Sequence, residues 1–530
     1  MDRHRSRLAG PTTWVDERPV GVALARTVSV GVIGLFVAWP AARLIVSAVD
    51  ATAARQVFGS ERTWRIVGFT LAQATLSTLA TLALALPGAW LLGRHRFRAR
   101  RLLTALWSAP FALPSVVVGS ALLVALPDSI ERSMLSIIAA HVLFNVGMVT
   151  RVLGEAWEAS DERLEQAAAT LGASPSMRVR LMLRILLPEL ASLAGLVMAL
   201  CLTSFGIIRI LGGPLLQTIE TEIHRQTFQN LRIDRAAVLA LLQLVLVGSA
   251  LVLTSRRRSG ASTSFRSLVP MPRWIGRFII VMLTTLTALP IVVLANRATR
   301  WPTPTNNKSR GLQAFNELRA ITRGSGLLNA PIASLATSIR TALFATGLAV
   351  ALALVTVVGA NSSRVVTTIA SLPLAVSGVT LGLGTLLGFA ASPLDWRSRW
   401  WMVPVTQGMV AFPFALRVLR PAYDAIDPRL RQVAATLGTN RVTTFFRVVL
   451  PNVRGPLAAA TALAAAVSLG EFGATSFLVR ERSETIPVAI GLLTARPGER
   501  LQAQAAALCV ILAAMTMGLT AAASMTGRRR

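Results

Sequence analysis

Charged residues are scarce in this sequence. Of its 530 residues only 15% are charged, whereas 53% are hydrophobic. Because soluble globular proteins carry roughly 25% charged residues, a large soluble protein is disfavoured. A disordered chain is excluded as well, since disordered segments are poor in apolar residues.

Lysine, histidine and cysteine are also nearly absent. Lys308 is the only lysine, and it follows Asn307 rather than the glycine of a Gly-Lys-Ser/Thr phosphate-binding loop. The chain therefore has no standard P-loop of its own. There are only 4 histidines, too few for a zinc cluster, and Cys201 and Cys509 lie inside apolar runs. We predict no metal site, no disulfide framework and no cofactor bound by this chain.

Aromatic residues make up 6% of the chain, with a single tyrosine, although the net charge is +30. A single-strand nucleic-acid surface would combine a continuous basic face with stacking aromatics. Here the basic residues instead cluster beside apolar segments, at 94–101, 256–273 and 528–530. Positive residues collect in cytoplasmic loops of membrane proteins. We therefore predict a bilayer protein with both termini cytoplasmic and no nucleic-acid partner.

Apolar segments of a length that crosses a bilayer, about 20 residues, follow one another along the chain. There are twelve, at 24–47, 66–92, 103–126, 134–154, 189–211, 235–255, 276–296, 333–359, 365–390, 400–420, 455–479 and 502–525. Pro110, Pro114 and Pro373 predict kinks. The intervening loops on the outer side are expected to be mixed in charge, except the basic segment 297–332, whose role the topology does not explain.

The two halves of the sequence repeat each other. Ala169-Thr170-Leu171-Gly172 matches Ala435-Thr436-Leu437-Gly438, and Phe205-Gly206 and Thr218-Ile219 match Phe472-Gly473 and Thr485-Ile486. An even number of spans per half gives both halves the same orientation, which makes the repeat parallel. We predict an all-α polytopic protein of about twelve transmembrane helices. Its repeats are 1–255 and 276–530, joined by a basic cytoplasmic linker at 256–275.

Two polar segments occupy matching places between the fourth and fifth spans of each half, at 155–188 and 421–451. Each predicts a short helix up to its glycine, a turn, and a second helix that ends before Leu-Pro. Asp161 and Asp427 predict the helix starts. A duplicated helix–turn–helix on the cytoplasmic face suggests two equivalent docking sites, whereas ordinary amphipathic loop helices are the alternative.

Both segments resemble the EAA loop of binding-protein-dependent ABC importer permeases, whose pattern is E-A-A-x3-G-x9-I-x-L-P. The likeness covers the whole chain and is close to the fused permeases of the ferric-iron and thiamine branch, which is related to spermidine and putrescine permeases. It implies that these loops contact the ATPase. The matching positions are Glu165, Gln166, Ala168, Gly172, Pro188, Gln432, Ala434, Gly438 and Pro451.

The loops also depart from the family pattern. Gln166 and Gln432 replace the family glutamate, although Glu165 is adjacent in the first loop. Val433 replaces an alanine, and the stretch from Gly172 to Pro188 is three residues longer than in the second loop. The resemblance therefore implies a contact of shape at the two glycines rather than a contact of charge.

The translocation pathway is predicted from a few residues of the fifth and eleventh spans, with Glu471 well inside the eleventh. Glu471 is an acid inside an apolar span, and such residues are functional candidates. Its counterpart in the first half is Ser204, followed by Phe205, as Phe472 follows Glu471. The alternatives are that Glu471 pairs with an arginine or lies near the outer interface, and that the other three residues only pack helices.

The resemblance implies a permease of an ATP-driven importer in the cell membrane, not an enzyme. Two copies of an ATPase subunit would supply ATP and Mg²⁺ chemistry, and an external binding protein would deliver the solute. Ferric iron and thiamine come first by resemblance, with polyamine, phosphonate and sulfate-like solutes still open. An ion-gradient-driven secondary transporter is the alternative, but it usually needs intramembrane carboxylates, which are sparse here. A membrane-embedded enzyme is a third reading, for which no nucleophile–base set stands out.

Overall fold

The computed structural model describes residues 20–213, 215–254, 268–302, 309–360, 370, 376–390, 394–396, 398–480 and 483–526. Within these ranges ten helices are long and apolar enough to cross a membrane, and a bent pair makes an eleventh candidate. The shorter apolar helix Gly378–Gly388 occupies the ninth predicted segment, while Pro373 lies outside the described residues. The all-α polytopic architecture is confirmed.

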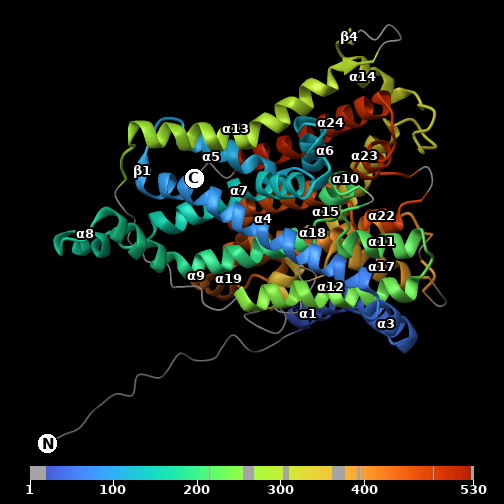
Figure 1. Cartoon of the computed structure of the whole chain (residues 1–530). Helices are drawn as coiled ribbons and strands as arrows, with labels where there is room; N and C mark the ends of the chain where they lie inside the picture. Colours follow the sequence, from blue (N-terminus) through green and yellow to red (C-terminus); the bar gives the residue numbers. More distant parts are fainter. Residues whose placement is uncertain are drawn as a thin grey trace, which may run out of the picture.

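The first half runs from α1 to α12 (Figure 1). Its elements are α1 Val20–Ile33, η1 Gly34–Ala38, α2 Trp39–Ala48, α3 Ala51–Phe58, α4 Glu61–Arg94, β1 His95–Arg96, α5 Arg100–Ser108, η2 Ala109–Ala112, α6 Ser115–Ala125, α7 Met134–Glu158, α8 Glu162–Thr170, α9 Pro175–Leu202, α10 Phe205–Leu211, α11 Ile219–Phe228 and α12 Ile233–Thr254.

The second half follows after β2 Val269–Pro270. Its elements are α13 Arg273–Ala298, β3 Arg300–Trp301, β4 Ser309–Arg310, α14 Gln313–Asn316, η3 Glu317–Arg319, α15 Ala333–Ala360, α17 Gly378–Gly388, α18 Met402–Asp424, α19 Pro428–Thr436, α20 Arg441–Thr444, η5 Phe445–Val449, α21 Leu450–Gly470, α22 Thr475–Leu478, α23 Ile486–Thr494 and α24 Glu499–Thr526.

The third span is sharply bent, as Pro110 and Pro114 predict. The axes of the helical stretches Arg100–Ala112 and Ser115–Ala125 differ by 103°. The bend lets the backbone of Trp107 approach α7 so closely that a Cβ at Gly147 would lie 1.7 Å from the Trp107 carbonyl oxygen. A glycine is therefore required at this helix crossing.

Two predicted spans are wrong as continuous helices. The segment 189–211 contains the end of α9 at Leu202 and the separate helix α10, and the segment 455–479 contains the end of α21 at Gly470 and the separate helix α22. Glu471 therefore lies at a helix break and not well inside a span. Hydropathy does not detect these breaks, because the residues on both sides of them are equally apolar.

The first helix of each half packs against the other half. Helix α1 contacts α15, and α2 contacts α17, whereas α13 contacts α4, α5, α6 and α7. The Thr356 hydroxyl donates a hydrogen bond to that of Ser29 at 3.2 Å, and a Cβ at Gly359 would lie 2.7 Å from the Arg26 nitrogen. In Figure 1, α13 and α1 flank opposite sides of the molecule. Because each half contributes its first helix to the packing of the other, the two halves share an extensive interface.

The buried core is continuous across the halves at their centre. Its largest cluster includes Val117 of α6, Phe205 of α10, Phe472 beside α22, and Leu508 of α24. Phe205 and Phe472 thus belong to the same cluster although 267 residues separate them in the sequence. Helices from both repeats meet here, which places the candidate pathway residues at the interface between halves.

The two ends of the molecule differ in structure. Helices α8 and α19 lie toward one end, and α3, α11, α14, α22 and α23 toward the opposite end (Figure 1). At the α8 end, β1 pairs in parallel with β2, so that the end of the predicted linker is held against the first half. At the opposite end, β3 and β4 form an antiparallel pair. Within the predicted basic segment 297–332, the Gln504 side chain of α24 donates to the Glu317 carbonyl oxygen at 2.7 Å, so this segment covers the end of α24.

Candidate functional site

The two EAA-like segments are called the coupling loops, after their predicted contact with the ATPase. The first, 155–188, is a helix, a glycine turn and a second helix. The Asp161 carboxylate accepts a hydrogen bond from the Arg163 N–H at 2.9 Å, which fixes the start of α8. After α8, Gly172 has a φ of +79°, and the Ala173 N–H donates to the Ala168 carbonyl oxygen at 2.9 Å. This bond, from the second residue beyond the helix, defines a Schellman turn.

The second coupling loop, 421–451, has the same turn. The Asp427 carboxylate accepts from the Arg429 N–H at 2.9 Å, and the Thr439 N–H donates to the Ala434 carbonyl oxygen at 3.1 Å. Gly438 has a φ of +73°. A Cβ at Gly172 or Gly438 would meet no atom within 4 Å, so backbone conformation and not crowding requires glycine here.

The prediction that each second helix ends before Leu-Pro is wrong. Pro188 lies inside α9, a helix of 28 residues that continues beyond it to Leu202. Pro451 lies in the first turn of α21, directly after the π-helical turn Phe445–Val449. Proline ends a helix only when no compensation is available, and a π-turn just before the proline supplies the space for its ring in the second loop. Each coupling loop is thus continuous with a helix that reaches the interface between halves.

Apolar side chains protrude at both glycine turns. Leu171 is 86% exposed and Leu437 is 76% exposed. Gln166 and Gln432 are exposed, whereas Ala434 is buried and Ala168 is half-buried. Paired exposed leucines at equivalent positions indicate an interaction surface rather than scattered exposure. They therefore favour docking sites over ordinary loop helices.

The two loops differ in how they are attached to the membrane helices. Glu165 is buried and forms an ion pair with Arg94 at the end of α4. The equivalent position of the second loop, 266 residues later, is Arg431, which cannot form the same pair. The glutamate next to the family position in the first loop therefore anchors that loop within the chain.

Aromatic side chains from both halves meet between α10, α11 and α22. The ring centroids of Phe205 and Phe472 lie 5.1 Å apart at an interplanar angle of 32°. His224 of α11 stacks beside Phe205 at 5.5 Å, and Phe228 lies 5.2 Å from Phe477 of the second half. We call these five residues the aromatic interface. It places the predicted pathway residues Phe205 and Phe472 in direct contact.

Glu471 has a structural role that was not predicted. Its carboxylate accepts hydrogen bonds from the Ala474 and Thr475 N–H groups, both at 2.8 Å, and from the Thr475 hydroxyl at 2.5 Å. These are the free N–H groups of the first turn of α22. The described hydrogen-bond partners of Glu471 thus lie at the start of α22. The alternative prediction, that Glu471 pairs with an arginine, finds no support among the described residues. Ser204, its counterpart, is buried.

A buried acid that the sequence did not single out lies close by. Glu220 was assigned to an outer loop of mixed charge, but it lies on α11 and its side chain is fully buried. The Gln243 amide of α12 donates a hydrogen bond to the Glu220 carboxyl group at 3.2 Å. The side chains of Ser377 and Glu471, both from the second half, are close enough to interact with it electrostatically. The one available indication was the match of Thr218-Ile219 to Thr485-Ile486, which shows that this stretch belongs to the repeated membrane unit.

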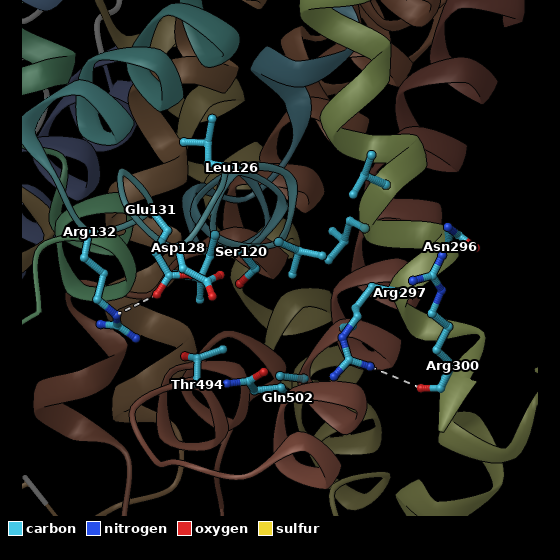
Figure 2. Close-up of a pocket in the computed structure, with 16 residues that line it drawn as sticks. Ser120, Leu126, Asp128, Glu131, Arg132, Asn296, Arg297, Arg300, Thr494 and Gln502 are labelled. Atoms are coloured by element: carbon cyan, nitrogen blue, oxygen red, sulfur yellow. Dashed lines mark hydrogen bonds and ion pairs between the residues drawn. The ribbon is translucent and has the colours of Figure 1, made fainter. Parts of the chain in front are cut away.

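A charged pocket of about 320 Å³ opens at the end opposite the coupling loops, between α6, α13 and α24. Figure 2 shows Asp128, Glu131 and Arg132 on one wall and Arg297 and Arg300 on the other. Arg132 and Glu131 form an ion pair at 3.6 Å, and the Arg297 guanidinium donates to the Arg300 carbonyl oxygen at 3.2 Å. Part of the basic 297–332 segment thus lines a space between the halves.

Duplicated loops, a repeated set of membrane helices and a shared interface define a membrane translocation subunit. The family model described as "Binding-protein-dependent transport system inner membrane component" matches residues 85–264 and again 343–526, more than half of the chain. The chain belongs to this family of ABC importer permeases and is a translocation subunit, not an enzyme. The alternative of an ion-gradient-driven secondary transporter is thereby set aside.

Individual relatives cover most of the chain. The thiamine transport system permease protein ThiP of Brucella suis is 29% identical over 497 residues, 86% of each chain. ThiP of Escherichia coli K12 is 28% identical over 464 residues, 80% of this chain and 82% of its own. The molybdenum transport system permease protein ModB of the same strain is 35% identical over 160 residues, 28% of this chain and 69% of its own. Members of this family work with an ATPase and a solute-binding protein.

Proposed function

We propose that this chain is the permease of a thiamine importer in the cell membrane. The observation that carries the proposal is likeness to the ThiP permeases along both fused halves, over 86% of each chain in one case. ModB matches only 28% of this chain. Ferric iron, the other predicted solute, gains no support from these relatives.

The coupling loops suggest how the partners are arranged. Two equivalent loops are suited to two copies of an ATPase subunit, which would hold ATP and Mg²⁺. The loop end then faces the cytoplasm together with both termini, and the opposite end receives the external binding protein. The arginine cluster at 94–101, which includes β1 at the loop end, agrees with this orientation.

The helices that follow the loops connect the ATPases to the interface. Helix α9 spans 28 residues, roughly 40 Å at 1.5 Å per residue, from the first loop to within three residues of Phe205. Helix α21 ends two residues before Phe472. A displacement of both loops on closure of the ATPase dimer therefore moves Phe205 and Phe472 relative to each other. Separation of this pair opens the pathway, and ATP hydrolysis restores the contact.

Uptake into proteoliposomes tests this function. The chain is reconstituted with its ATPase and binding protein, and ATP-dependent uptake of labelled thiamine is measured beside molybdate and ferric iron. Uptake of thiamine that requires both partner proteins supports the proposal. ATP-dependent uptake of molybdate or iron in its place contradicts the proposed solute but leaves the permease class intact.

A further inference from the structure

The face of α11 that meets the second half carries one acid and two aromatic rings. Glu220, His224 and Phe228 are spaced four residues apart, which places them on one side of a helix. His224 contacts Phe477 at 5.5 Å and Phe205 at 5.5 Å, and Phe228 contacts Phe477 at 5.2 Å. Glu220 therefore lies on the same face of α11 as the two rings, about one turn before His224.

Two buried acceptors, one on this face and one on the adjacent helix α12, lack hydrogen-bond partners in the part of the chain that the structure describes. They are the Oε2 atom of Glu220 and the Oε1 atom of Gln243, both in fully buried side chains. The Gln243 amide is fixed by donating to the Leu202 carbonyl oxygen at 2.7 Å and to Glu220. Buried polar atoms are normally paired. Because a hydrogen bond joins the Glu220 and Gln243 side chains, their two remaining oxygens together offer acceptors for a ligand.

The electrostatic surroundings favour a cation. The charged side chain that acts on Glu220 from the second half is Glu471, which has the same sign. Glu471 accepts hydrogen bonds on both of its oxygens, so it offers no free acceptor. Burial disfavours the ionised form of Glu220, and a cation entering between the halves would stabilise that form. The aromatic rings beside it add stacking and cation–π attraction.

We infer that Glu220 and Gln243, backed by the aromatic interface, form a recognition site for an aromatic organic cation with an N–H donor, occupied when the halves separate. The inference rests on the proposed function. The thiazolium ring of thiamine supplies the positive charge for Glu220 and the rings. Its aminopyrimidine supplies N–H groups for the Gln243 oxygen. The site lies between the ends of α9 and α21, which would move when the coupling loops are displaced.

The test compares thiamine with an uncharged analogue in which a neutral ring replaces thiazolium. Both are presented to the complete importer in proteoliposomes at concentrations that saturate the binding protein. For Glu220→Gln we expect the rate of thiamine uptake to fall about tenfold or more, the loss expected for removing one charged partner. Uptake of the neutral analogue should change less than about twofold, because it makes no charge contact at this position.

Two further variants separate recognition from folding. Glu220→Asp keeps the charge and should keep the preference for thiamine. Glu222→Gln, two residues away on the same helix, removes a buried acid that is already paired with Arg225 and Arg62, and should leave the ratio of the two uptake rates unchanged.

The possible results are distinct. If Glu220→Gln lowers the uptake rates of thiamine and of the neutral analogue equally, Glu220 has a structural role and the inference is overturned. An unchanged rate of thiamine uptake would overturn it as well. In both cases a wild-type importer that carries thiamine leaves the proposed function standing. A wild type that carries no thiamine overturns both.

Discussion

Phe205 and Phe472 occupy equivalent positions of the two halves, and their rings touch, with centroids 5.1 Å apart. Each lies just beyond the helix that begins at a coupling loop. If the proposed function holds, the motions of both loops converge at this contact, and the contact keeps the resting protein closed.

Removing the aromatic ring of Phe472 should destabilise the closed state. An aromatic pair contributes about 0.5–1.5 kcal/mol beyond area burial, so in Phe472→Ala we expect the ATPase rate without binding protein to rise about fivefold. The control is Phe36→Ala, at a different aromatic pair. This change removes a ring whose centroid lies 5.7 Å from that of Phe389. An unchanged basal rate in Phe472→Ala would contradict a closing role.

Aspartate at the second glycine turn should uncouple ATP hydrolysis from transport. Gly438 has a φ of +73°, which costs other residues about 1–2 kcal/mol, and the added charge lies beside exposed Leu437. We expect Gly438→Asp to insert normally and hydrolyse ATP without uptake. Gly455→Ala, in open space on α21, should behave as wild type. Normal uptake by Gly438→Asp at normal expression would rule out the coupling role.

The Arg94–Glu165 pair should stabilise the first loop alone. Because Glu165 is buried, removing one partner costs more than at the surface, about 1–3 kcal/mol. We expect Glu165→Gln to lower the number of solutes carried per ATP and the double exchange Arg94→Glu with Glu165→Arg to recover part of it. Glu155→Gln, which breaks the exposed pair with Arg151, should change little. Equal effects of the two single glutamine variants would refute the anchoring role.

Packing of α1 on the second half should depend on Gly359. A side chain there would collide with the backbone of Arg26, whereas Gly347 on the same helix faces open space. We expect Gly359→Leu to lower the thermal unfolding midpoint in detergent, with a cost of about 1–3 kcal/mol from overpacking. Gly347→Leu is the matched control, and equal midpoints for the two variants would argue against a close crossing.

Docking of the β2 strand should weaken as the pH falls. Burial lowers the pKa of His95 below 6.5 and Arg94 acts in the same direction, although a hydrogen bond to the Pro270 carbonyl oxygen opposes the shift. The undocked state then binds a proton first, so the stabilisation is complete above about pH 6.5 and is lost below it. Amide exchange of Val269 should accelerate from pH 7.5 to 5.5 in wild type. His95→Gln should remove this dependence, and its persistence in the variant would assign it to another group.

Several features of the site could be predicted because they depend on local chemistry. The glycine turns at 172 and 438 follow from the need for positive φ after a short capped helix, and the bend of the third span follows from Pro110 and Pro114. Glu220 could not be predicted as a site residue. Its burial comes from α11 folding back between α4, α12 and α17, and a ten-residue helix with several charges resembles a surface loop when only its own sequence is considered.

The sequence by itself determined that the chain is a membrane protein of two parallel halves with paired coupling loops, because hydrophobic length, arginine placement and repeated motifs are properties of the chain alone. Only the tertiary structure decided where the spans break, that the first helix of each half crosses to the other, and that Glu220 lies beside the aromatic interface. These features depend on which surfaces fit closely together. Such a fit involves residues far apart in the sequence, as the contacts of Gly359 with Arg26 and of Phe205 with Phe472 show.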